Sequence, residues 1–203
     1  MTELPISGAV IAVIDRVGHR STVAVTDPVA ARWDELELEL GTGPLTDATV
    51  ESAPQLVSDA REAALNPVIG AHLVALGVRA LFAFPLTLGM ATVGVVGLYR
   101  TRAGPLTSDN VSVAISLARS ASAPAVREAL QRARSEGNVE LEGSGPGLRR
   151  EVHQATGMLS AQLDVSTTEA FARLRGYAIS SGRSITAVSL DIVTGTIDGA
   201  DID

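Results

Sequence analysis

Three consecutive segments near the end of the chain decide how that part folds: LRREVHQATGMLSAQL at residues 148–163, STTEAFARLRGYAISSG at 166–182 and RSITAVSLDIVTG at 183–195. In each segment apolar side chains recur every three or four positions, which places them on one face of an amphipathic helix. In chain order they are Leu148, Val152, Ala155, Leu159, Leu163, Ala170, Phe171, Leu174, Tyr177, Ala178, Ile185, Val188 and Ile192. The spacing predicts three short helices that bury these faces together in a small bundle.

The ends of these predicted helices carry residues that favour helix initiation and termination. Ser166 and Glu169 have the spacing of a capping box, in which each side chain accepts a hydrogen bond from the other residue's backbone amide. We expect Gly182 to end the second helix with a positive φ angle. We also expect the Ser184 side chain to cap the third helix.

Three motifs in this region resemble a known domain family. They are Gln154-Ala155-Thr156-Gly157-Met158-Leu159, then Glu169-Ala170-Phe171-x-x-Leu174-Arg175, then Gly182-Arg183-Ser184-Ile185 followed by Val188. Together, in this order and spacing, they are similar to the ANTAR domain, the RNA-binding module of bacterial transcription antitermination regulators. The resemblance covers about a quarter of the chain. It implies binding to RNA stem-loops in leader transcripts.

The predicted RNA-binding residues lie opposite the apolar face of the first helix, with additional arginines from the other two helices. RNA-binding domains usually bind exposed loop bases by stacking and polar contacts, and bind phosphates through Arg or Lys. The candidates are Arg149, Arg150, His153, Gln154, Thr156, Gly157, Arg173, Arg175 and Arg183. A glycine inside a helix costs about 1 kcal/mol relative to alanine, so Gly157 indicates a close approach by a neighbouring helix or by RNA.

Two departures from the family pattern lower the RNA affinity that we expect. Thr156 stands where many ANTAR domains have a basic residue, and the tail that follows Val193 is acidic. We expect weak binding at physiological salt unless a dimer brings two such modules together.

Composition narrows the class of protein. The chain has 203 residues, 46% of them hydrophobic and 19% charged, which is typical of a globular protein with a sizeable core. All 16 basic residues are Arg, and there is no Cys, which excludes disulfides and thiolate chemistry. The N-terminus lacks the basic region of a signal peptide and no apolar run is long enough to span a bilayer, so we expect a cytoplasmic protein.

Neither metal binding nor catalysis is indicated. His19, His72 and His153 stand in different predicted elements, and none has a second ligand at metal-site spacing. The glycine-rich run at 143–147 is not followed by Gly-Lys-Ser/Thr and has no preceding strand, so it is not a phosphate loop. The sequence therefore predicts no enzyme, no cofactor and no metal site.

The first two thirds of the chain predict an α+β domain with one antiparallel sheet. Strand-type runs occupy residues 8–16, 21–26, 54–58, 78–88 and 91–99. Helical patterns occupy 28–40, 45–52, 59–76, interrupted at Asn66-Pro67, and 105–134, where Pro124 predicts a kink. We assign residues 1–135 to this domain, 136–147 to a flexible linker and 148–203 to the helical domain with an acidic tail.

This first domain resembles a GAF domain. The resemblance rests on Leu40-Gly41-Thr42-Gly43-Pro44, on the run from Gly77 to Leu86 and on Gly94-Val95-Val96-Gly97-Leu98-Tyr99. It implies a small-molecule sensor that forms a homodimer through its terminal helices. The candidate ligand-binding residues are Trp33, Phe82, Phe84 and Tyr99. An ordinary core-filling role for these four aromatic side chains is the favoured alternative, and the ligand is not identified.

The sequence therefore predicts a signal-responsive transcription antitermination regulator that binds RNA stem-loops through its C-terminal helices. One alternative is a non-enzymatic sensor whose helical domain docks on a partner protein. A second is a DNA-binding helix-turn-helix regulator, which is disfavoured because Arg183 is the single basic residue near the start of the third helix.

Overall fold

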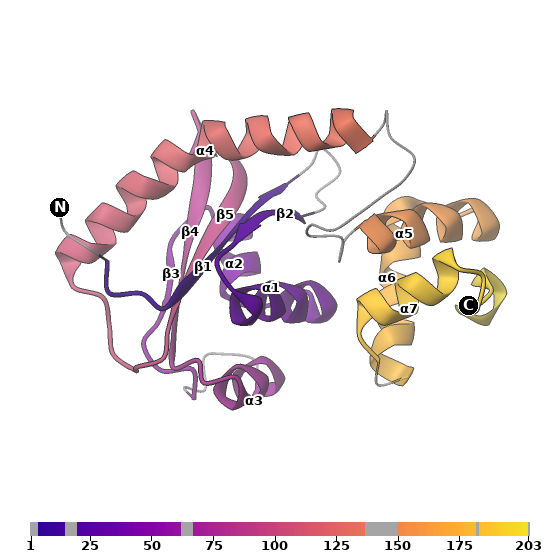
Figure 1. The fold of residues 1–203 in the computed structure, drawn as a ribbon, viewed down its shortest axis with the longest axis horizontal. Coiled ribbons are helices and arrows are strands. Elements are labelled where there is room, and N and C mark those ends of the chain that lie inside the picture. Colours follow the sequence, from indigo (N-terminus) through magenta and orange to yellow (C-terminus); the bar gives the residue numbers. More distant parts are fainter. Residues whose placement is uncertain (1–3, 15–19, 62–66, 137–149, 182, 203) are drawn as a thin grey trace. The chain divides into compact units, whose positions relative to one another are not determined.

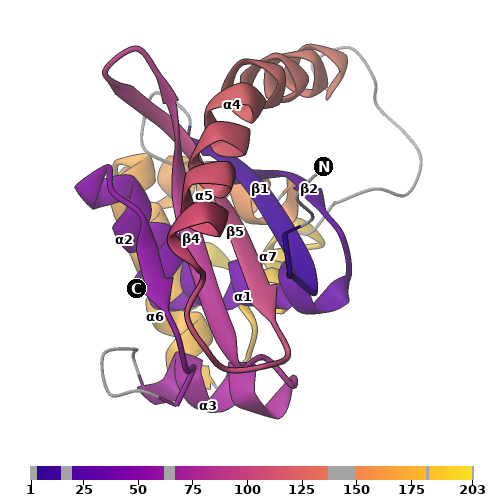
Figure 2. The same cartoon turned by 90° about the vertical axis from the view of Figure 1, so that its left-hand side faces the viewer.

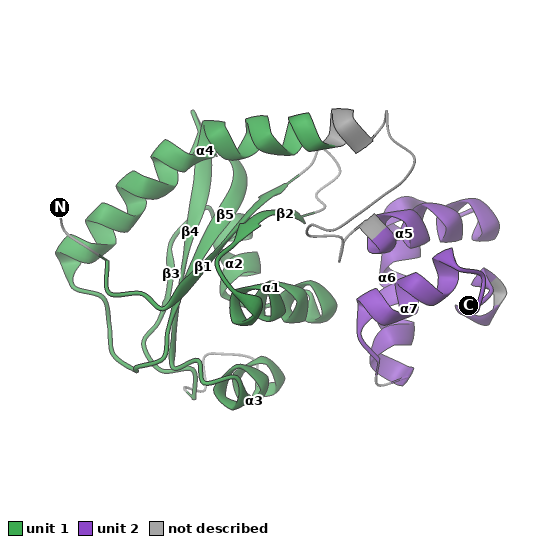
Figure 3. Cartoon of the chain, viewed as in Figure 1, with its two compact units in different colours: residues 1–140 green, residues 141–203 purple. Residues whose placement is uncertain are grey.

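The computed structural model describes residues 4–14, 20–61, 67–136, 150–181 and 183–202. The chain divides into two compact units, residues 1–140 and residues 141–203 (Figure 3). The predicted linker at 136–147 lies almost wholly outside the described residues, as do Leu148, Arg149 and Gly182.

Unit 1 (residues 1–140) is built on a five-stranded antiparallel sheet (Figure 1). Its strands are β1 (Gly8–Ile14), β2 (Arg20–Val25), β3 (Gln55–Val57), β4 (Ala80–Leu88) and β5 (Ala91–Arg100). Their order across the sheet is β2-β1-β5-β4-β3. The β4–β5 hairpin, turning at Gly89 with φ 62°, contributes the two longest strands and occupies the middle of the sheet with β1.

The helices of unit 1 lie on both faces of this sheet (Figure 2). They are α1 (Pro28–Leu40), α2 (Pro44–Glu51), α3 (Pro67–Ala75) and α4 (Ser108–Glu136). One core lies between the sheet and α1, α2 and α3, and a second lies between the sheet and α4. Both faces are apolar because successive side chains of a strand point to opposite sides, and nearly every position of β4 is apolar.

The long helix α4 contains Pro124, as predicted, and changes direction part-way along its length (Figure 1). A proline inside a helix removes one backbone hydrogen bond and its ring clashes with the carbonyl four residues earlier. Ala114, Ala118 and Ala125 are buried against the sheet. These small side chains let the helix lie close to the strands on both sides of the proline.

Unit 2 (residues 141–203) is a helical bundle made of α5 (Arg150–Leu163), α6 (Thr167–Ser181), α7 (Ile185–Val193) and a short 3₁₀ helix, η2 (Gly199–Ile202). Its core contains the predicted apolar residues from Val152 to Ile192, with Ile202 added from η2, whereas Leu148 lies outside the described residues. The fold class predicted from the sequence, α+β with a C-terminal three-helix bundle, is confirmed.

The helix ends of unit 2 differ in part from the sequence prediction. The Ser184 hydroxyl accepts from the Ala187 amide at 3.1 Å, and the Ser166 hydroxyl accepts from the Glu169 amide at 3.2 Å. The Glu169 carboxylate bonds instead to Arg173, so half of the predicted capping box forms. A residue with positive φ ends α5: Asp164 has φ 53°, and the Val165 amide closes the turn on the Ser160 carbonyl.

One predicted helix differs from the structure at its start. The pattern at 59–76 predicted helix on both sides of Asn66-Pro67, but residues 60–61 form a turn, residues 62–66 lie outside the described part, and α3 is described from Pro67. Asp59 explains this turn, because its carboxylate accepts from the Arg61 amide at 3.0 Å and from the Arg61 guanidinium. Among the described helices, none is long and apolar enough to cross a membrane.

Candidate nucleic-acid interface and sensor core

The outward face of α5 carries the polar residues that the sequence placed there. Val152, Ala155 and Leu159 are buried in the bundle core, whereas His153, Gln154 and Gly157 are exposed. Residues three and four apart share one face of a helix, so these exposed positions form a continuous strip. Arg150, one turn earlier, begins α5 on the same strip by position, while its side chain is outside the described part and Arg149 is wholly outside it.

Thr156 does not belong to this strip, and its prediction as an exposed RNA-facing residue is wrong. It is four residues after Val152 and therefore lies on the core face, where it is 4% exposed. Its hydroxyl donates to the Val152 carbonyl at 2.7 Å, which satisfies the buried polar group within the helix. Thr156 is therefore a core residue whose side chain is unavailable to a ligand.

Gly157 has open space around it. A Cβ built at this position would meet no other described atom within 4 Å. Of the two interpretations drawn from the sequence, close approach by a neighbouring helix is excluded for the described helices of unit 2. The remaining interpretation, close approach by an external molecule, stays a prediction. Gly176 on α6 is open in the same way.

The arginines of the other two helices are engaged to different degrees. The Arg173 guanidinium bonds to Glu169 one turn earlier at 2.9 Å, and Arg183 bonds to Asp191 of α7 at 2.5 Å. Arg175 is half-buried and makes no ion pair with any described residue. Because Arg173 and Arg175 are two positions apart, they point to opposite sides of α6. The three arginines whose side chains the structure describes, Arg173, Arg175 and Arg183, are therefore not all free on one face.

The four aromatic residues predicted to share a ligand pocket lie on opposite faces of the sheet. Trp33 and Tyr99 belong to the core under α1, α2 and α3, whereas Phe82 and Phe84 belong to the core under α4. Leu81 pairs with Tyr99 across the sheet, so Phe82 must point the other way. Phe82 and Phe84 therefore do not lie on the same side of the sheet as Trp33 and Tyr99, and the prediction that all four bind one ligand is wrong. All four are buried as core residues.

Trp33 packs directly on the sheet at Gly97. A Cβ at Gly97 of β5 would lie 2.7 Å from its indole ring, so the ring rests directly on the glycine. The indole Nε1 donates to the Glu37 carboxylate at 2.5 Å. The Tyr99 hydroxyl donates to Asp27 at 3.0 Å, and burial together with this carboxylate raises the pKa of Tyr99 to about 12. Both aromatic side chains have structural hydrogen bonds.

A buried ionic network joins β2, α1 and α2 in unit 1. The Arg20 guanidinium lies 3.1 Å from the Asp34 carboxylate and 4.0 Å from the Glu37 carboxylate. Thr22 donates to Asp34 at 2.6 Å. The Glu37 carboxylate also accepts from the backbone amides of Leu45 at 3.2 Å and Thr46 at 3.0 Å. It thereby caps the start of α2, where Gly43 has no side chain to do so.

Burial dominates the electrostatics of this network. Glu37 is fully buried, and the loss of solvation raises its pKa to about 7, although Arg20 and the hydrogen-bond donors act in the opposite direction. This network was not predicted from the sequence, because Arg20, Asp34 and Glu37 form no recognisable motif. The sequence signal for it is the spacing of Asp34 and Glu37, which follow Trp33 by one and four positions in a helical pattern.

The described residues contain no group of three or more His, Asp or Glu side chains that could hold a metal ion. His72 lies on the exposed surface of α3, with Nδ1 at 2.7 Å from the Val68 carbonyl oxygen. His153 is exposed on α5, and His19 lies outside the described part of the chain.

Comparison with known families identifies the bundle. Residues 148–193 match the model of the ANTAR domain family. The match covers α5, α6 and α7 and the segments between them. No curated protein matches the chain significantly.

Comparison with solved structures identifies the fold of unit 1. The GAF domain region of a protein from Geobacter sulfurreducens superposes with a TM-score of 0.51 at 18% identity, covering 61% of this chain and 82% of that one. The GAF domain of a phosphoenolpyruvate-protein phosphotransferase from Coxiella burnetii gives a TM-score of 0.49 at 18% identity, covering 67% and 78%. Unit 1 therefore has the GAF fold, and residues 148–193 are an ANTAR domain, as both resemblances in the sequence implied.

Proposed function

Taking an ANTAR domain joined to a GAF fold as the premise, we propose that this protein is a cytoplasmic, signal-responsive regulator that binds RNA stem-loops and prevents transcription termination. The ANTAR match at 148–193 carries this proposal, because that family consists of RNA-binding antitermination modules. Both domains are regulatory modules, so we assign no enzymatic activity.

The outward strip of α5 supports RNA as the ligand. His153 and Gln154 supply polar side chains for loop bases, and Gly157 leaves the backbone accessible. Base recognition in RNA loops depends on such stacking and polar contacts more than on a continuous groove. Arg150, by its position one turn before, adds a cation for phosphate contacts.

In this proposal the GAF-fold unit detects the signal. A signal can regulate RNA binding only if it favours one arrangement of the protein over another, such as the dimer over the monomer. α4 is the terminal helix of the unit, and its exposed Leu117 and Leu130 are candidates for a homodimer contact. The chemical class of the signal is not assigned.

Binding to a pool of structured bacterial leader RNAs tests the RNA-binding function. We expect the full-length protein to enrich stem-loops at low and at physiological salt, and the variant His153→Ala/Gln154→Ala to lose that enrichment while keeping its helical content. The variant Arg119→Ala/Arg127→Ala on α4 is the control, because both side chains are exposed in unit 1, and it retains the enrichment. If the wild-type protein enriches no RNA at either salt concentration, the proposal is wrong.

A protein-docking function is the second candidate, supported by two exposed aliphatic side chains in unit 2. Ile179 on α6 is 56% exposed and Leu190 on α7 is 49% exposed. Failure of RNA enrichment together with capture of one specific protein, lost on Ile179→Ser, would support this function. Duplex DNA is a poorer ligand, because Arg183 near the start of α7 is held by Asp191.

A further inference from the structure

Four arginines of unit 1 lie at one end of its sheet, where β3 and β5 finish and β4 begins. Two backbone hydrogen bonds join the three chain segments there. The Ala60 amide donates to the Arg79 carbonyl at 2.8 Å, and the Arg79 amide donates to the Arg100 carbonyl at 2.8 Å. The segments carry Arg61, Arg79, Arg100 and Arg102, and we call these four residues the arginine end.

The members of the arginine end differ in how they are held. Arg100 is fixed, because its guanidinium donates to the Gly104 and Pro105 carbonyls and lies 5.2 Å from the centre of the Phe82 ring. Arg61 is 64% exposed and bonds to Asp59. Arg79 and Arg102 make no ion pair with any residue that the structure describes.

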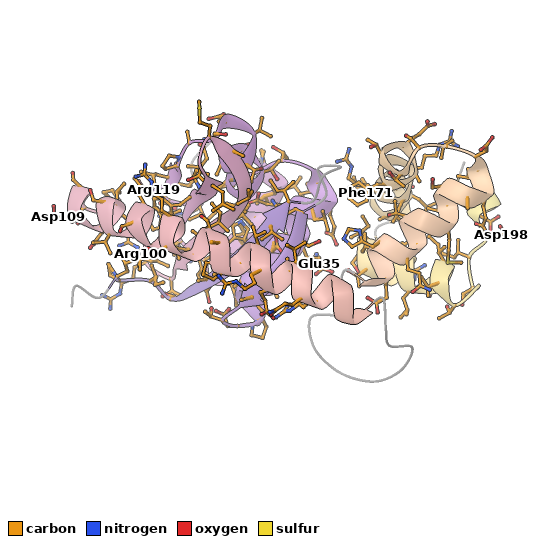
Figure 4. All side chains as sticks on the ribbon, turned by 90° about the horizontal axis from the view of Figure 1, so that it is seen from above. Glu35, Arg100, Asp109, Arg119, Phe171 and Asp198 are labelled. Atoms are coloured by element: carbon orange, nitrogen blue, oxygen red, sulfur yellow. The ribbon has the colours of Figure 1, made fainter. Side chains whose placement is uncertain are left out.

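Asp59 is the single described carboxylate in contact with these guanidinium groups. Hydrogen bonds from Arg61, with a smaller effect of Arg79, lower the pKa of Asp59 to about 2. The next carboxylate along the chain, Glu62, lies outside the described residues. Asp109 stands at the start of α4, beyond the loop that follows Arg102, with Arg119 farther along the same helix (Figure 4). Among the described residues, positive charge therefore dominates this end of the sheet, in a chain of net charge −7.

Phosphate groups are the ligands that fit such a surface. The planar guanidinium group donates two parallel hydrogen bonds to phosphate oxygens, and it stays charged at every physiological pH. The ANTAR domain has few cations available for the same task, since Arg173 and Arg183 are held by acidic side chains. RNA affinity depends strongly on the number of phosphates that a protein neutralises.

We propose that the arginine end of unit 1 binds the phosphate backbone of the RNA whose loops the ANTAR domain recognises. This inference rests on the proposed RNA-binding function and adds a second contact surface to it. Two weak contacts with one RNA molecule raise the overall affinity, because the second contact forms at a high effective concentration. Arg79 and Arg102 make the phosphate contacts, and Arg100 positions the strand end that carries them.

The salt dependence of RNA affinity tests this proposal in the full-length protein. The probes are an enriched leader RNA and a shortened form of it that contains the stem-loops alone. The test variant is Arg79→Ala/Arg102→Ala, and the control is Arg119→Ala/Arg127→Ala, which removes the same charge from the solvent side of α4. Each lost phosphate contact reduces the slope of log affinity against log salt by about 0.7 to 0.9.

We expect the test variant to bind the full leader RNA about 10-fold more weakly at low salt, with a slope smaller by about 1.5. The control variant keeps the wild-type slope, and Arg79→Lys/Arg102→Lys restores most of it because lysine retains the charge. The shortened RNA distinguishes phosphates of flanking strands from phosphates of the stems, since the effect disappears with it in the first case and persists in the second.

Two results separate this inference from the proposed function. Equal slopes for the test and control variants overturn the arginine end as a phosphate site, while RNA binding that depends on His153 and Gln154 leaves the proposed function intact. Absence of RNA binding by the wild-type protein overturns both. If Arg79→Ala/Arg102→Ala alters the Trp33 fluorescence, which reports a change in the fold of unit 1, Arg102→Ala alone becomes the test variant. For this single substitution we expect about half of the change in slope.

Discussion

Gly157 lies inside α5 with open space where a Cβ would be, so the fold itself gains nothing from a glycine there. We expect Gly157→Ala to stabilise the bundle by about 1 kcal/mol, because alanine is the better helix former and meets no neighbour. Denaturant unfolding of the full-length protein, followed by far-UV circular dichroism, measures this gain. If the exposed strip of α5 contacts RNA, the methyl group that Gly157→Ala adds lowers the affinity for RNA.

Gly176→Ala on α6 is the matched control for this experiment. Its Cβ position is equally open, so we expect a similar gain in stability. A loss of stability in either variant would show that the fold needs the glycine at that position. A gain in both stability and RNA affinity for Gly157→Ala would contradict a close approach of RNA at this residue.

Gly43 is required by the fold for two reasons. Its φ angle is 128°, a conformation that L side chains rarely adopt, and a Cβ there would lie 2.5 Å from Cδ of Glu37. We expect Gly43→Ala to destabilise unit 1 by about 3 kcal/mol. Gly89→Ala is the control, because its positive φ is accompanied by open space, and it costs about 1 kcal/mol. Unfolding followed by Trp33 fluorescence measures both, and equal losses would contradict the steric argument.

At the scale of elements, Glu37 makes the packing of α1 against α2 sensitive to pH. Its pKa rises from 4.5 in the unfolded chain to about 7 in the folded protein. Between these values the folded protein binds more protons than the unfolded chain, so stability is highest at the acidic end of this range and falls as pH rises through about 7. Above that pH the contribution is constant.

The Glu37→Gln variant removes this titration. We expect the free energy of unfolding of the wild type to decrease from pH 5 to pH 8, and that of Glu37→Gln to change less over the same range. Asp47, whose pKa is also raised, acts in the same direction in both proteins and cancels in the comparison. The lowered pKa values of Asp27 and Asp59 affect stability at lower pH. Parallel curves for the two proteins would show that Glu37 does not titrate in this range.

The helices and strands could be predicted because apolar residues recur at clear helical and strand spacings. The contacts between these elements could not be predicted from the sequence. The helical spacing identified the bundle core, and the apolar hairpin of β4 and β5 was clear. The faces on which Phe82 and Tyr99 lie depend on strand register, which a sequence does not reveal when both faces are apolar. The arginine end and the Arg20 network likewise depend on which strands and helices become neighbours.

At the scale of the whole molecule, each hydrophobic core lies within one unit. Two cores belong to the sheet of unit 1 and the third belongs to the bundle, and each core is made of described residues of a single unit. Cooperative unfolding depends on shared buried contacts. We therefore propose that each unit folds without the other and that residues 136–147 are the flexible linker.

Limited proteolysis with a glutamate-specific protease tests this organisation. The proposed linker contains Glu136, Glu140 and Glu142. We expect the first cuts there, because flexible segments rich in Gly and Ser fit a protease active site whereas helices and strands must first unfold. Two resistant fragments follow, one with native Trp33 fluorescence and one with a helical circular dichroism spectrum.

The exposed Glu51 at the end of α2 and Glu169 in α6 are internal controls for this experiment, since both are accessible side chains within helices. Earlier cleavage at either would show that a helix opens more readily than the linker. We expect the variant Glu136→Gln/Glu140→Gln/Glu142→Gln to slow the first cleavage without changing the rate of the later cleavages at Glu51 and Glu169. Loss of the C-terminal fragment immediately after the first cut would instead show that the bundle depends on unit 1, and RNA binding would then require both units for stability as well as for contact.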